Sequence, residues 1–220
     1  MIELFAHGSP NPHKVSIALE ELGLAYKVTP LNPYAGEGNT PAYLRLNPNG
    51  KVPTIIDHET GITVYESNAI LLYLAEKTGR LLPKDQAGRW EATKWLFFQA
   101  ACVGPMYGQR AHFSLFAPQK ILYAIKRYED EGDRLSEIIN KQLTDRQYFL
   151  DEYSIVDIAH FGWAHCALAQ GFALNRFPAY AQWYERMAAR AAVKKGVTIP
   201  GPLPDMSPFV QARKEFHMAE

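Results

Sequence analysis

Cysteine is scarce in this sequence of 220 residues, which contains only Cys102 and Cys166. Two cysteines this far apart form neither a disulfide framework nor the ligand set of a zinc site. Both lie in stretches with helical periodicity, where a free cysteine packs as a small apolar residue. The sequence also lacks an H-E-x-x-H pattern. We therefore expect two buried free thiols and no metal site.

Long apolar runs and excess charge are missing too. The longest uninterrupted apolar run, within AILLYLA, has about seven residues, whereas a membrane-spanning helix needs about 20. The first residues, MIELFAHGSP, lack the basic and apolar regions of a signal peptide. Lysine plus arginine and aspartate plus glutamate both total 23, and no basic stripe indicates a nucleic-acid partner. We therefore expect a soluble, cytoplasmic protein whose partners include neither membranes nor nucleic acids.

Residues 1–79 alternate between strand-like and helix-like segments. Strands at 2–6 and 25–31 flank a helix at 11–23, which Asn11 can cap, Pro12 begins and Gly23 ends. Two strands joined through a helix are expected to be parallel. The segments that follow are a short helical piece at 41–48, a hairpin of strands at 51–57 and 62–66, and a helix at 67–79. This pattern predicts a small α/β domain.

Beyond residue 87 the periodicity is helical. Gly104–Pro105 is expected to kink or break the first of these helices, and residues 178–193 are predicted to form one helix. The tail is rich in proline, so we expect it to be extended, with a short helix from Pro208 onward. The predicted division is an α/β domain at 1–79, a linker at 80–86, an all-α domain at 87–195 and a proline-rich tail at 196–220.

Three places in the first domain offer polar groups to a ligand. Ser9 and Asn11, in SPNP after the first strand, are expected at the mouth of the sheet. A proline at the start of a strand removes a ladder donor, which leaves the backbone of Val52 for a ligand. Glu66 and Ser67 begin a helix whose free N–H groups attract a carboxylate, and the Glu66 carboxylate attracts an ammonium group.

Each of these places also has a purely structural explanation. Asn11 and Ser67 can simply cap their helices. Ser9 can be a turn residue, and Glu66 can complement the helix dipole. Because X-Pro bonds are mostly trans, the pattern alone favours a trans bond before Pro53. Taken together, the three places match one ligand, with a carboxylate and an ammonium group at one end, an extended middle and a thiol at the other end. A γ-glutamyl tripeptide has this layout.

The chain contains the motifs SPNPHKVSIALEE, NPNGKVPTIID, YESNAILLYLAEKTG, KWLFFQ, GPMYGQ, APQKILYAIKRYEDE and YSIVDIA. These motifs resemble the glutathione transferase family, in particular its nu class of glutathione-dependent disulfide-bond oxidoreductases. They are also similar to the C-terminal region of the yeast nitrogen-regulation prion protein, and the resemblance covers residues 1–195. It implies a thioredoxin-like α/β domain followed by an all-α domain, a cis Val52–Pro53 bond and a homodimer. Ser154 and Asp157 form an S-x-x-D capping box, which begins a core helix in this family.

The resemblance also implies roles for individual residues. Asn11 matches the asparagine that contacts the glutathione sulfur, and Ser9, where the class carries threonine, keeps a hydroxyl donor beside it. Val52 would pair with the cysteinyl backbone, while Glu66 and Ser67 would hold the γ-glutamyl end. The remaining members of the implied glutathione site are Lys51, Arg127, which would reach a glutathione carboxylate, and Asn39, which stands with Gly38 where the family often has a glutamine.

The SPNP turn carries no cysteine or tyrosine, so thiol–disulfide chemistry there would use the sulfur of glutathione as a cosubstrate. Lowering the pKa of that thiol from about 8.5 to about 6.5 requires about 2.7 kcal/mol of selective stabilisation of the thiolate. Two donors, Ser9 and Asn11, at about 1.5–3 kcal/mol each, could supply it. The two prolines would hold both donors in place before the thiol arrives.

Three functions follow from these residues. The first is reduction of small disulfides, and the second is a transferase or peroxidase that uses the same thiolate on small electrophiles or hydroperoxides. The third is a non-catalytic glutathione-binding interaction module, against which the complete set of site residues argues. The two enzymes would differ in the pocket for the second substrate. Its candidate residues, which could equally serve in packing between the domains, are Tyr107, Arg110, His112 and Phe113.

Overall fold

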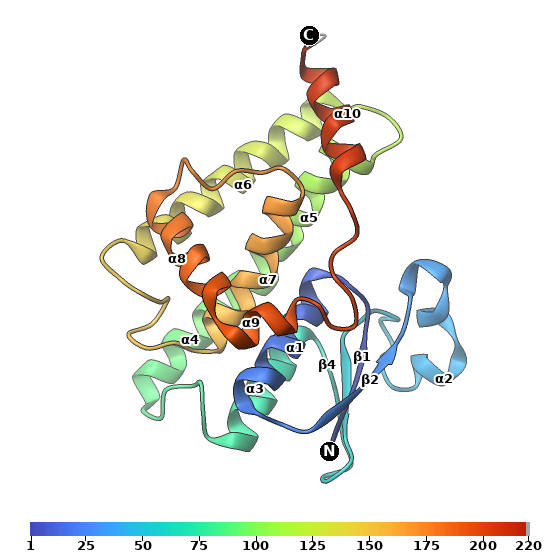
Figure 1. Cartoon of the computed structure of the whole chain (residues 1–220), viewed down its shortest axis with the longest axis vertical. Coiled ribbons are helices and arrows are strands. Elements are labelled where there is room, and N and C mark those ends of the chain that lie inside the picture. Colours follow the sequence, from blue (N-terminus) through green and yellow to red (C-terminus); the bar gives the residue numbers. More distant parts are fainter. Residues whose placement is uncertain (219–220) are drawn as a thin grey trace.

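The computed structural model describes residues 1–218 and shows a small mixed sheet followed by a helical domain (Figure 1). Among the described residues, four strands form one sheet in the order β2-β1-β3-β4. The predicted architecture of an α/β domain followed by an all-α domain is confirmed. The strands are β1 (Ile2–Ala6), β2 (Tyr26–Pro30), β3 (Thr54–Asp57) and β4 (Ile62–Tyr65).

The first two strands are parallel, as predicted, because helix α1 (Pro10–Leu22) crosses between them. Their register pairs Ile2 with Tyr26, whereas β3 runs antiparallel to both β1 and β4. Prolines occupy the first turn of α1, and Gly23 ends the helix in the left-handed region at φ 67°. The local signals in the sequence therefore predict the α1 boundaries to within one residue at each end.

The rest of the first domain contains two helices and two 3₁₀ turns. Helices α1 and α3 lie on the side of the sheet that faces the helical domain, and α2 lies beyond the sheet on the other side (Figure 1). This arrangement brings the starts of α1 and α3 close to the helical domain. The elements are η1 (Pro33–Ala35), η2 (Glu37–Asn39), α2 (Pro41–Leu44) and α3 (Ser67–Thr78).

The second domain is built on a buried central helix, α7. Its first turn has the predicted capping box, in which Asp157 Oδ2 accepts a hydrogen bond from the Ser154 backbone N–H at 3.0 Å. The box fixes where α7 begins. The helices of this domain are α4 (Gln86–Phe98), α5 (Gly104–Ala111), α6 (Leu122–Leu143), α7 (Ile155–Ala169), α8 (Pro178–Ala189) and α9 (Ala191–Gly196).

No helix break occurs at Gly104–Pro105. A π-helical segment, η3 (Gln99–Val103), joins α4 directly to α5, and a second one, η4 (His112–Phe116), follows α5. Proline lacks the N–H of a regular turn and its ring clashes with the preceding turn. The wider π-helical turn relieves this conflict while the helical path continues.

Residues 178–193 form two helices rather than the predicted single one. Arg190 separates α8 from α9 and has extended backbone angles, φ −66° and ψ 136°. Its guanidinium bonds to both carboxylate oxygens of Glu21 on α1, at 2.7 and 3.0 Å, and lies 3.7 Å from the centre of the Tyr153 ring. This ion pair between the domains holds the chain in the turn that interrupts the helix.

The start of the tail crosses the first turns of α1. Ser16 Oγ donates to the Gly196 carbonyl at 2.7 Å, and His13 Nε2 lies 3.0 Å from the Gly201 carbonyl oxygen. Helix α10 (Ser207–Met218) then rises away from the sheet (Figure 1). The predicted short helix is therefore present, while residues 219–220 of the predicted tail lie outside the described part.

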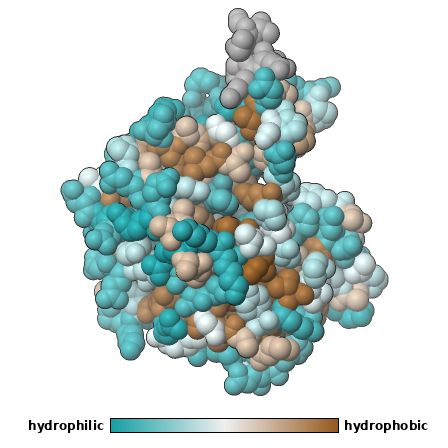
Figure 2. All heavy atoms as spheres, in the orientation of Figure 1, coloured by the Kyte–Doolittle hydropathy of each residue, from teal (hydrophilic) through white to brown (hydrophobic). Residues whose placement is uncertain are grey.

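The apolar side chains form one core that runs through both domains. The face shown in Figure 2 is mostly hydrophilic, with apolar residues in separate groups. Cys166 is buried, as predicted, whereas Cys102 is only half-buried, and both are free thiols. Within residues 1–218, no helix is both long and apolar enough to cross a membrane.

Candidate active site

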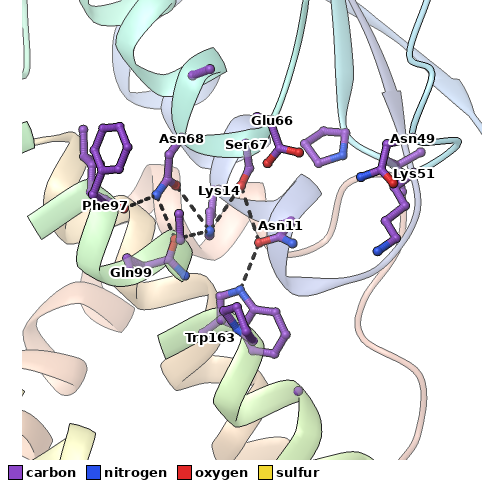
Figure 3. A pocket seen from close by; sticks show the side chains of 18 of the residues that line it. Asn11, Lys14, Asn49, Lys51, Glu66, Ser67, Asn68, Phe97, Gln99 and Trp163 are labelled. Atoms are coloured by element: carbon purple, nitrogen blue, oxygen red, sulfur yellow. Dashed lines mark hydrogen bonds between the residues drawn. The ribbon is translucent and has the colours of Figure 1, made fainter. Parts of the chain in front are cut away.

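A cavity of about 650 Å³ lies between the α/β domain and the helical domain. Its wall combines the starts of α1 and α3 and the loop before β3 with α4, η3, α5 and α7. Among the lining residues of the described chain there is no cysteine or tyrosine. The lining residues that bear on the chemistry are Asn11, Lys14, Asn49, Lys51, Val52, Pro53, Glu66, Ser67, Asn68, Phe97, Gln99 and Trp163 (Figure 3).

Asn11 lies in the first turn of α1 and is held through its amide oxygen. Its Oδ1 accepts a hydrogen bond from Trp163 Nε1 at 2.9 Å and a longer one from Ser67 Oγ at 3.5 Å. Figure 3 shows the amide oxygen turned toward these two partners and the amide nitrogen turned away from them. The N-cap position of α1 belongs to Ser9, so Asn11 does not cap the helix. Its amide nitrogen is left for a ligand.

Lys14 lies one turn further along α1, at the back of the cavity, and is 1% exposed. Its Nζ donates to Gln99 Oε1 at 2.7 Å, Ser67 Oγ at 3.2 Å and Asn68 Oδ1 at 3.3 Å (Figure 3). Burial lowers the pKa of Lys14 to about 7, although the charge of Glu66 acts in the opposite direction. The lysine thus connects α1, α3 and the π-helical segment η3.

We expect Lys14 to make the stability of the protein depend on pH. Its pKa is about 7 in the folded chain against an ordinary value of 10.5, so between these values the unfolded chain binds a proton that the folded chain lacks. The contribution of Lys14 to the free energy of unfolding therefore rises as the pH increases above 7 and falls as the pH drops toward 7. Denaturant unfolding of the wild type and Lys14→Met across this window measures the difference in slope.

The matched control for this experiment is Lys141→Met, which replaces an exposed lysine on α6. It should leave the pH slope of the wild type unchanged. Equal slopes for the wild type and Lys14→Met would show that the protonation of Lys14 is the same in the folded and unfolded chains.

Glu66 and Ser67 form the start of α3 at the cavity wall. Glu66 has φ 69°, in the left-handed region that is costly for a residue with a side chain and is found mainly at functional sites. Its carboxylate has no hydrogen-bond or ion-pair partner within the described chain. Ser67 is buried, and the first N–H groups of a helix lack partners inside the helix. This corner therefore offers both an anion site and a free carboxylate.

The loop before β3 presents unpaired backbone to the same cavity. The Val52–Pro53 bond is cis, in contrast to the trans bond that the sequence pattern favours and in agreement with the family resemblance. The Lys51 carbonyl accepts bonds from Tyr43 Oη and Asn47 Nδ2, both at 2.7 Å. Across residues 1–218, by contrast, the N–H and C=O groups of Val52 have no partner. An extended ligand backbone can pair with them.

Three predicted site residues lie outside the cavity wall. Ser9 Oγ points to the His7 carbonyl oxygen, at a long distance of 3.5 Å. Asn39 is exposed in η2, where its Oδ1 lies beside Gly50. Arg127 is exposed on α6. The structure thus gathers Asn11, Lys51, Val52, Glu66 and Ser67 around one cavity but does not bring these three to it.

The four candidates for a second-substrate pocket do not line the cavity either. Tyr107 is buried, with its hydroxyl 2.6 Å from Ser136 Oγ on α6. Arg110 lies 4.1 Å from the centre of the Phe172 ring. His112 and Phe113 contact each other edge to face, with ring centres 5.0 Å apart. These contacts correspond to a packing role. They are made within the helical domain and not between the two domains.

Sequence reasoning missed five polar residues of the site: Lys14, Asn49, Asn68, Gln99 and Trp163. One signal was available, because Lys14 is one helical turn after Asn11 and so lies on the same face of α1. Nothing local identifies Gln99 or Trp163, since both reach the cavity only through the packing of the helical domain. Among residues 1–213, whose side chains the structure describes, there is no group of three or more His, Cys, Asp or Glu residues placed to hold a metal ion.

Comparison with known proteins gives matches over both domains. A model of the glutathione S-transferase N-terminal domain matches residues 8–77, and a model of the glutathione S-transferase C-terminal domain matches residues 105–191. Disulfide-bond oxidoreductase YfcG of Escherichia coli is 41% identical over 198 residues, which cover 87% of this chain and 92% of the relative. Disulfide-bond oxidoreductase YghU of the same organism is 35% identical over 89% of this chain and 73% of the relative.

Solved structures are similar over nearly the whole chain. A glutathione transferase from Burkholderia graminis, described with two glutathione molecules bound per subunit, has a TM-score of 0.86 and 38% identity, covering 90% of this chain and 88% of that one. A glutathione transferase from Pseudomonas putida, described with one glutathione disulfide bound per subunit, has a TM-score of 0.86 and 36% identity, covering 91% and 92%. Ure2p in complex with glutathione has a TM-score of 0.83 and 34% identity, covering 89% and 97%.

Proposed function

The chain belongs to the glutathione S-transferase family and is a transferase-like enzyme, and we propose that it reduces disulfide bonds with the thiolate of a bound glutathione. The observation that carries this proposal is the free amide nitrogen of Asn11 in a cavity whose wall contains no cysteine or tyrosine. Because the wall offers no sulfur of its own, the reacting sulfur has to come from the ligand. Two relatives that bear the name disulfide-bond oxidoreductase support this assignment.

Glutathione is proposed to lie along the first-domain wall of the cavity. Its γ-glutamyl carboxylate would bind at the start of α3 beside Ser67, and its ammonium group would pair with Glu66. The cysteinyl backbone would bond to the unpaired N–H and C=O of Val52, near Lys51. This placement leaves the sulfur at the Asn11 amide nitrogen.

The proposed reaction has two exchange steps. The glutathione thiolate attacks one sulfur of a small disulfide, forming a mixed disulfide, and the other sulfur leaves as a thiolate that takes up a proton. A second glutathione thiolate then attacks the glutathione sulfur of the mixed disulfide. The products are glutathione disulfide and a second thiol. Structural relatives described with two glutathione molecules or with glutathione disulfide per subunit support this scheme.

The role proposed for Asn11 is to stabilise the attacking thiolate. A hydrogen bond to a charged group contributes about 1.5–3 kcal/mol, enough to lower the thiol pKa by about one to two units. Ser9 remains in the proposal as a second donor, because its bond to the His7 carbonyl is long and its hydroxyl can rotate. Lys14 Nζ and Trp163 Nε1 already have acceptors, whereas Gln99 Nε2, also on the cavity wall, has no partner within the described chain.

The test compares two activities of the same preparation: glutathione-dependent reduction of a small mixed disulfide, and conjugation of glutathione to an aryl halide. We expect strong reduction and weak conjugation. The reverse result would identify a transferase acting on electrophiles. Loss of both activities, with glutathione still bound, would identify a binding module.

A transferase or peroxidase is the second candidate function. The observation in its favour is the apolar part of the cavity, where Leu72, Leu96 and Phe97 line the wall. Phe97 is 67% exposed, so this part can receive a small apolar electrophile from solvent. The activity comparison above separates this candidate from the first.

Replacing Glu66 with glutamine is expected to weaken glutathione binding about tenfold and to leave kcat nearly unchanged. Glutamine keeps the shape of the side chain but not the charge that attracts the ammonium group. The expected tenfold change in the dissociation constant corresponds to about 1.4 kcal/mol. The dissociation constant can be measured by titration with glutathione. Glu185→Gln, at an exposed position of α8, is the control. An unchanged dissociation constant for Glu66→Gln would exclude Glu66 from the binding site.

The finer classification is also part of the proposal. We assign the chain to the nu class, with residues 1–79 as the glutathione-binding domain, 80–86 as the linker, 87–195 as the helical domain and the rest as a tail. Two copies are proposed to form a homodimer, because Trp90 on α4 is 64% exposed. A cytoplasmic location is proposed because both cysteines are free thiols and the reaction consumes reduced glutathione.

A further inference from the structure

Trp163 belongs to the helical domain but reaches the first turn of α1. Its indole Nε1 donates to Asn11 Oδ1 at 2.9 Å, across 152 residues of sequence. Figure 3 shows the indole at one side of the Asn11 amide, opposite the amide nitrogen. The contact therefore links α7 to the group that the proposed reaction uses.

The chemistry of the indole decides which way the amide faces. An indole N–H can only donate, whereas an asparagine amide has an accepting oxygen on one side and a donating NH₂ group on the other. The oxygen of Asn11 must therefore face Trp163, and the NH₂ group must face the opposite way. If the amide were turned over, two donors would face each other and a partly buried hydrogen bond would be lost.

A second contact reinforces this orientation. Lys14 Nζ donates to Ser67 Oγ at 3.2 Å, so the lone pairs of Ser67 face the lysine and its own proton is free to point elsewhere. That proton is directed to Asn11 Oδ1 at 3.5 Å. Both neighbours of the amide oxygen are thus donors, although the shorter and stronger bond comes from Trp163.

The indole is itself held in a slot on α5. A Cβ atom at Gly104 would lie 3.2 Å from Trp163 Nε1, and a Cβ atom at Gly108 would lie 3.3 Å from the six-membered ring. Both separations are closer than ordinary van der Waals contact. The absence of side chains at these two positions, one turn apart, gives the indole room beside the helix and fixes the direction of its N–H.

We propose that Trp163 is a positioning residue that orients the Asn11 amide so that its NH₂ group faces the glutathione sulfur. This inference rests on the proposed function, because it requires Asn11 to stabilise a thiolate. Trp163 acts through Asn11 and makes no bond to the sulfur. Without the indole N–H, the amide can turn its oxygen toward the thiolate. The partial negative charge of that oxygen and the negative charge of the thiolate repel each other.

Trp163→Phe tests the inference, because phenylalanine can occupy the slot but cannot donate a hydrogen bond. We expect the pKa of the bound glutathione thiol, followed by the ultraviolet absorbance of the thiolate, to rise by about one unit. Below the wild-type thiol pKa, kcat/KM for disulfide reduction should fall about tenfold, and much of the loss should be recovered at high pH. Affinity for glutathione should stay within about threefold of the wild type, since the γ-glutamyl contacts are intact.

Two further variants keep the experiment decisive. Trp95→Phe is the matched control, because it removes another indole hydrogen bond, to Glu91 at 3.1 Å, outside the cavity wall. It should leave the thiol pKa unchanged. The double variant Asn11→Ala/Trp163→Phe should be no slower than Asn11→Ala alone, since Trp163 acts only through Asn11. Damage to the fold would instead add to the effect of Asn11→Ala.

The outcomes separate this inference from the proposed function. A raised thiol pKa in Trp163→Phe together with a non-additive double variant supports the positioning role. An unchanged thiol pKa in Trp163→Phe, with a clear effect of Asn11→Ala, overturns the inference and leaves the proposed function standing. No effect of Asn11→Ala on the thiol pKa or on the rate overturns the proposed function and the inference with it.

Discussion

Replacing Asn11 with alanine is expected to lower kcat/KM for glutathione-dependent disulfide reduction by about a hundredfold. The amide nitrogen of Asn11, in the first turn of α1, is a donor on the cavity wall that the structure leaves free. A hydrogen-bond donor to negative charge that develops in the transition state commonly contributes about two orders of magnitude to the rate. The loss should shrink as the pH rises above the thiol pKa of free glutathione, because the thiolate then forms without assistance.

The measurement is a steady-state pH profile of disulfide reduction for the wild type and Asn11→Ala. Asn175→Ala, which removes an exposed amide between α7 and α8, is the control and should behave as the wild type. Thermal unfolding should be little changed in Asn11→Ala, because Asn11 does not cap α1. A variant that retains more than half of the wild-type kcat/KM at neutral pH would exclude Asn11 from the chemistry.

The second large effect concerns stability. Asp157 is completely buried, and its carboxylate accepts four hydrogen bonds. Oδ1 accepts from Trp183 Nε1 at 2.9 Å and from the Phe149 N–H at 3.1 Å, and Oδ2 accepts from the Ser154 N–H at 3.0 Å and from Ser154 Oγ at 3.2 Å. The carboxylate therefore joins the start of α7 to α8 and to the loop before α7.

Replacing Asp157 with alanine is expected to lower the free energy of unfolding by about 3–5 kcal/mol, because several buried donors lose their only acceptor. For a chain of this size, the melting temperature should fall by about 10 °C. Because burial raises the pKa of Asp157 to about 6, the comparison should be made well above that pH, where the carboxylate is charged.

Asp151→Ala provides the matched control for this prediction. Asp151 lies six residues earlier in the chain with a fully exposed side chain, 3.7 Å from Arg146. Its loss should change the free energy of unfolding by less than about 0.5 kcal/mol. If Asp157→Ala unfolds within about 1 kcal/mol of the wild type, the four hydrogen bonds contribute little net stability and the role assigned to the carboxylate is wrong.

Local signals were sufficient where an element depends on its own residues. The prolines of SPNP and Gly23 place the ends of α1 to within one residue, the Ser154–Asp157 box begins α7, and the alternating strands predict the sheet of the first domain. These signals act over a few residues, through caps, turns and side-chain periodicity, and so they can be read without the fold. The division into an α/β domain and an all-α domain follows from them.

Local patterns alone did not predict three features of the structure. The interruption at Arg190 follows from its ion pair with Glu21, which lies 169 residues away in the sequence. The continuous helical path through Gly104–Pro105 uses a π-helical turn that helical periodicity does not predict. A cis bond before Pro53 differs from the usual preference of such bonds, and here the family resemblance was the better guide.

The candidate site divides in the same way. The sequence by itself determined four first-domain residues that line the cavity, namely Asn11, Val52, Glu66 and Ser67, because each stands at the start of a helix or just before a strand. Only the tertiary structure decided how the back of the cavity is built. Gln99 meets Lys14 across 85 residues and Trp163 meets Asn11 across 152. Such pairs form only when the helical domain packs against α1, and no periodicity or cap within either segment encodes them.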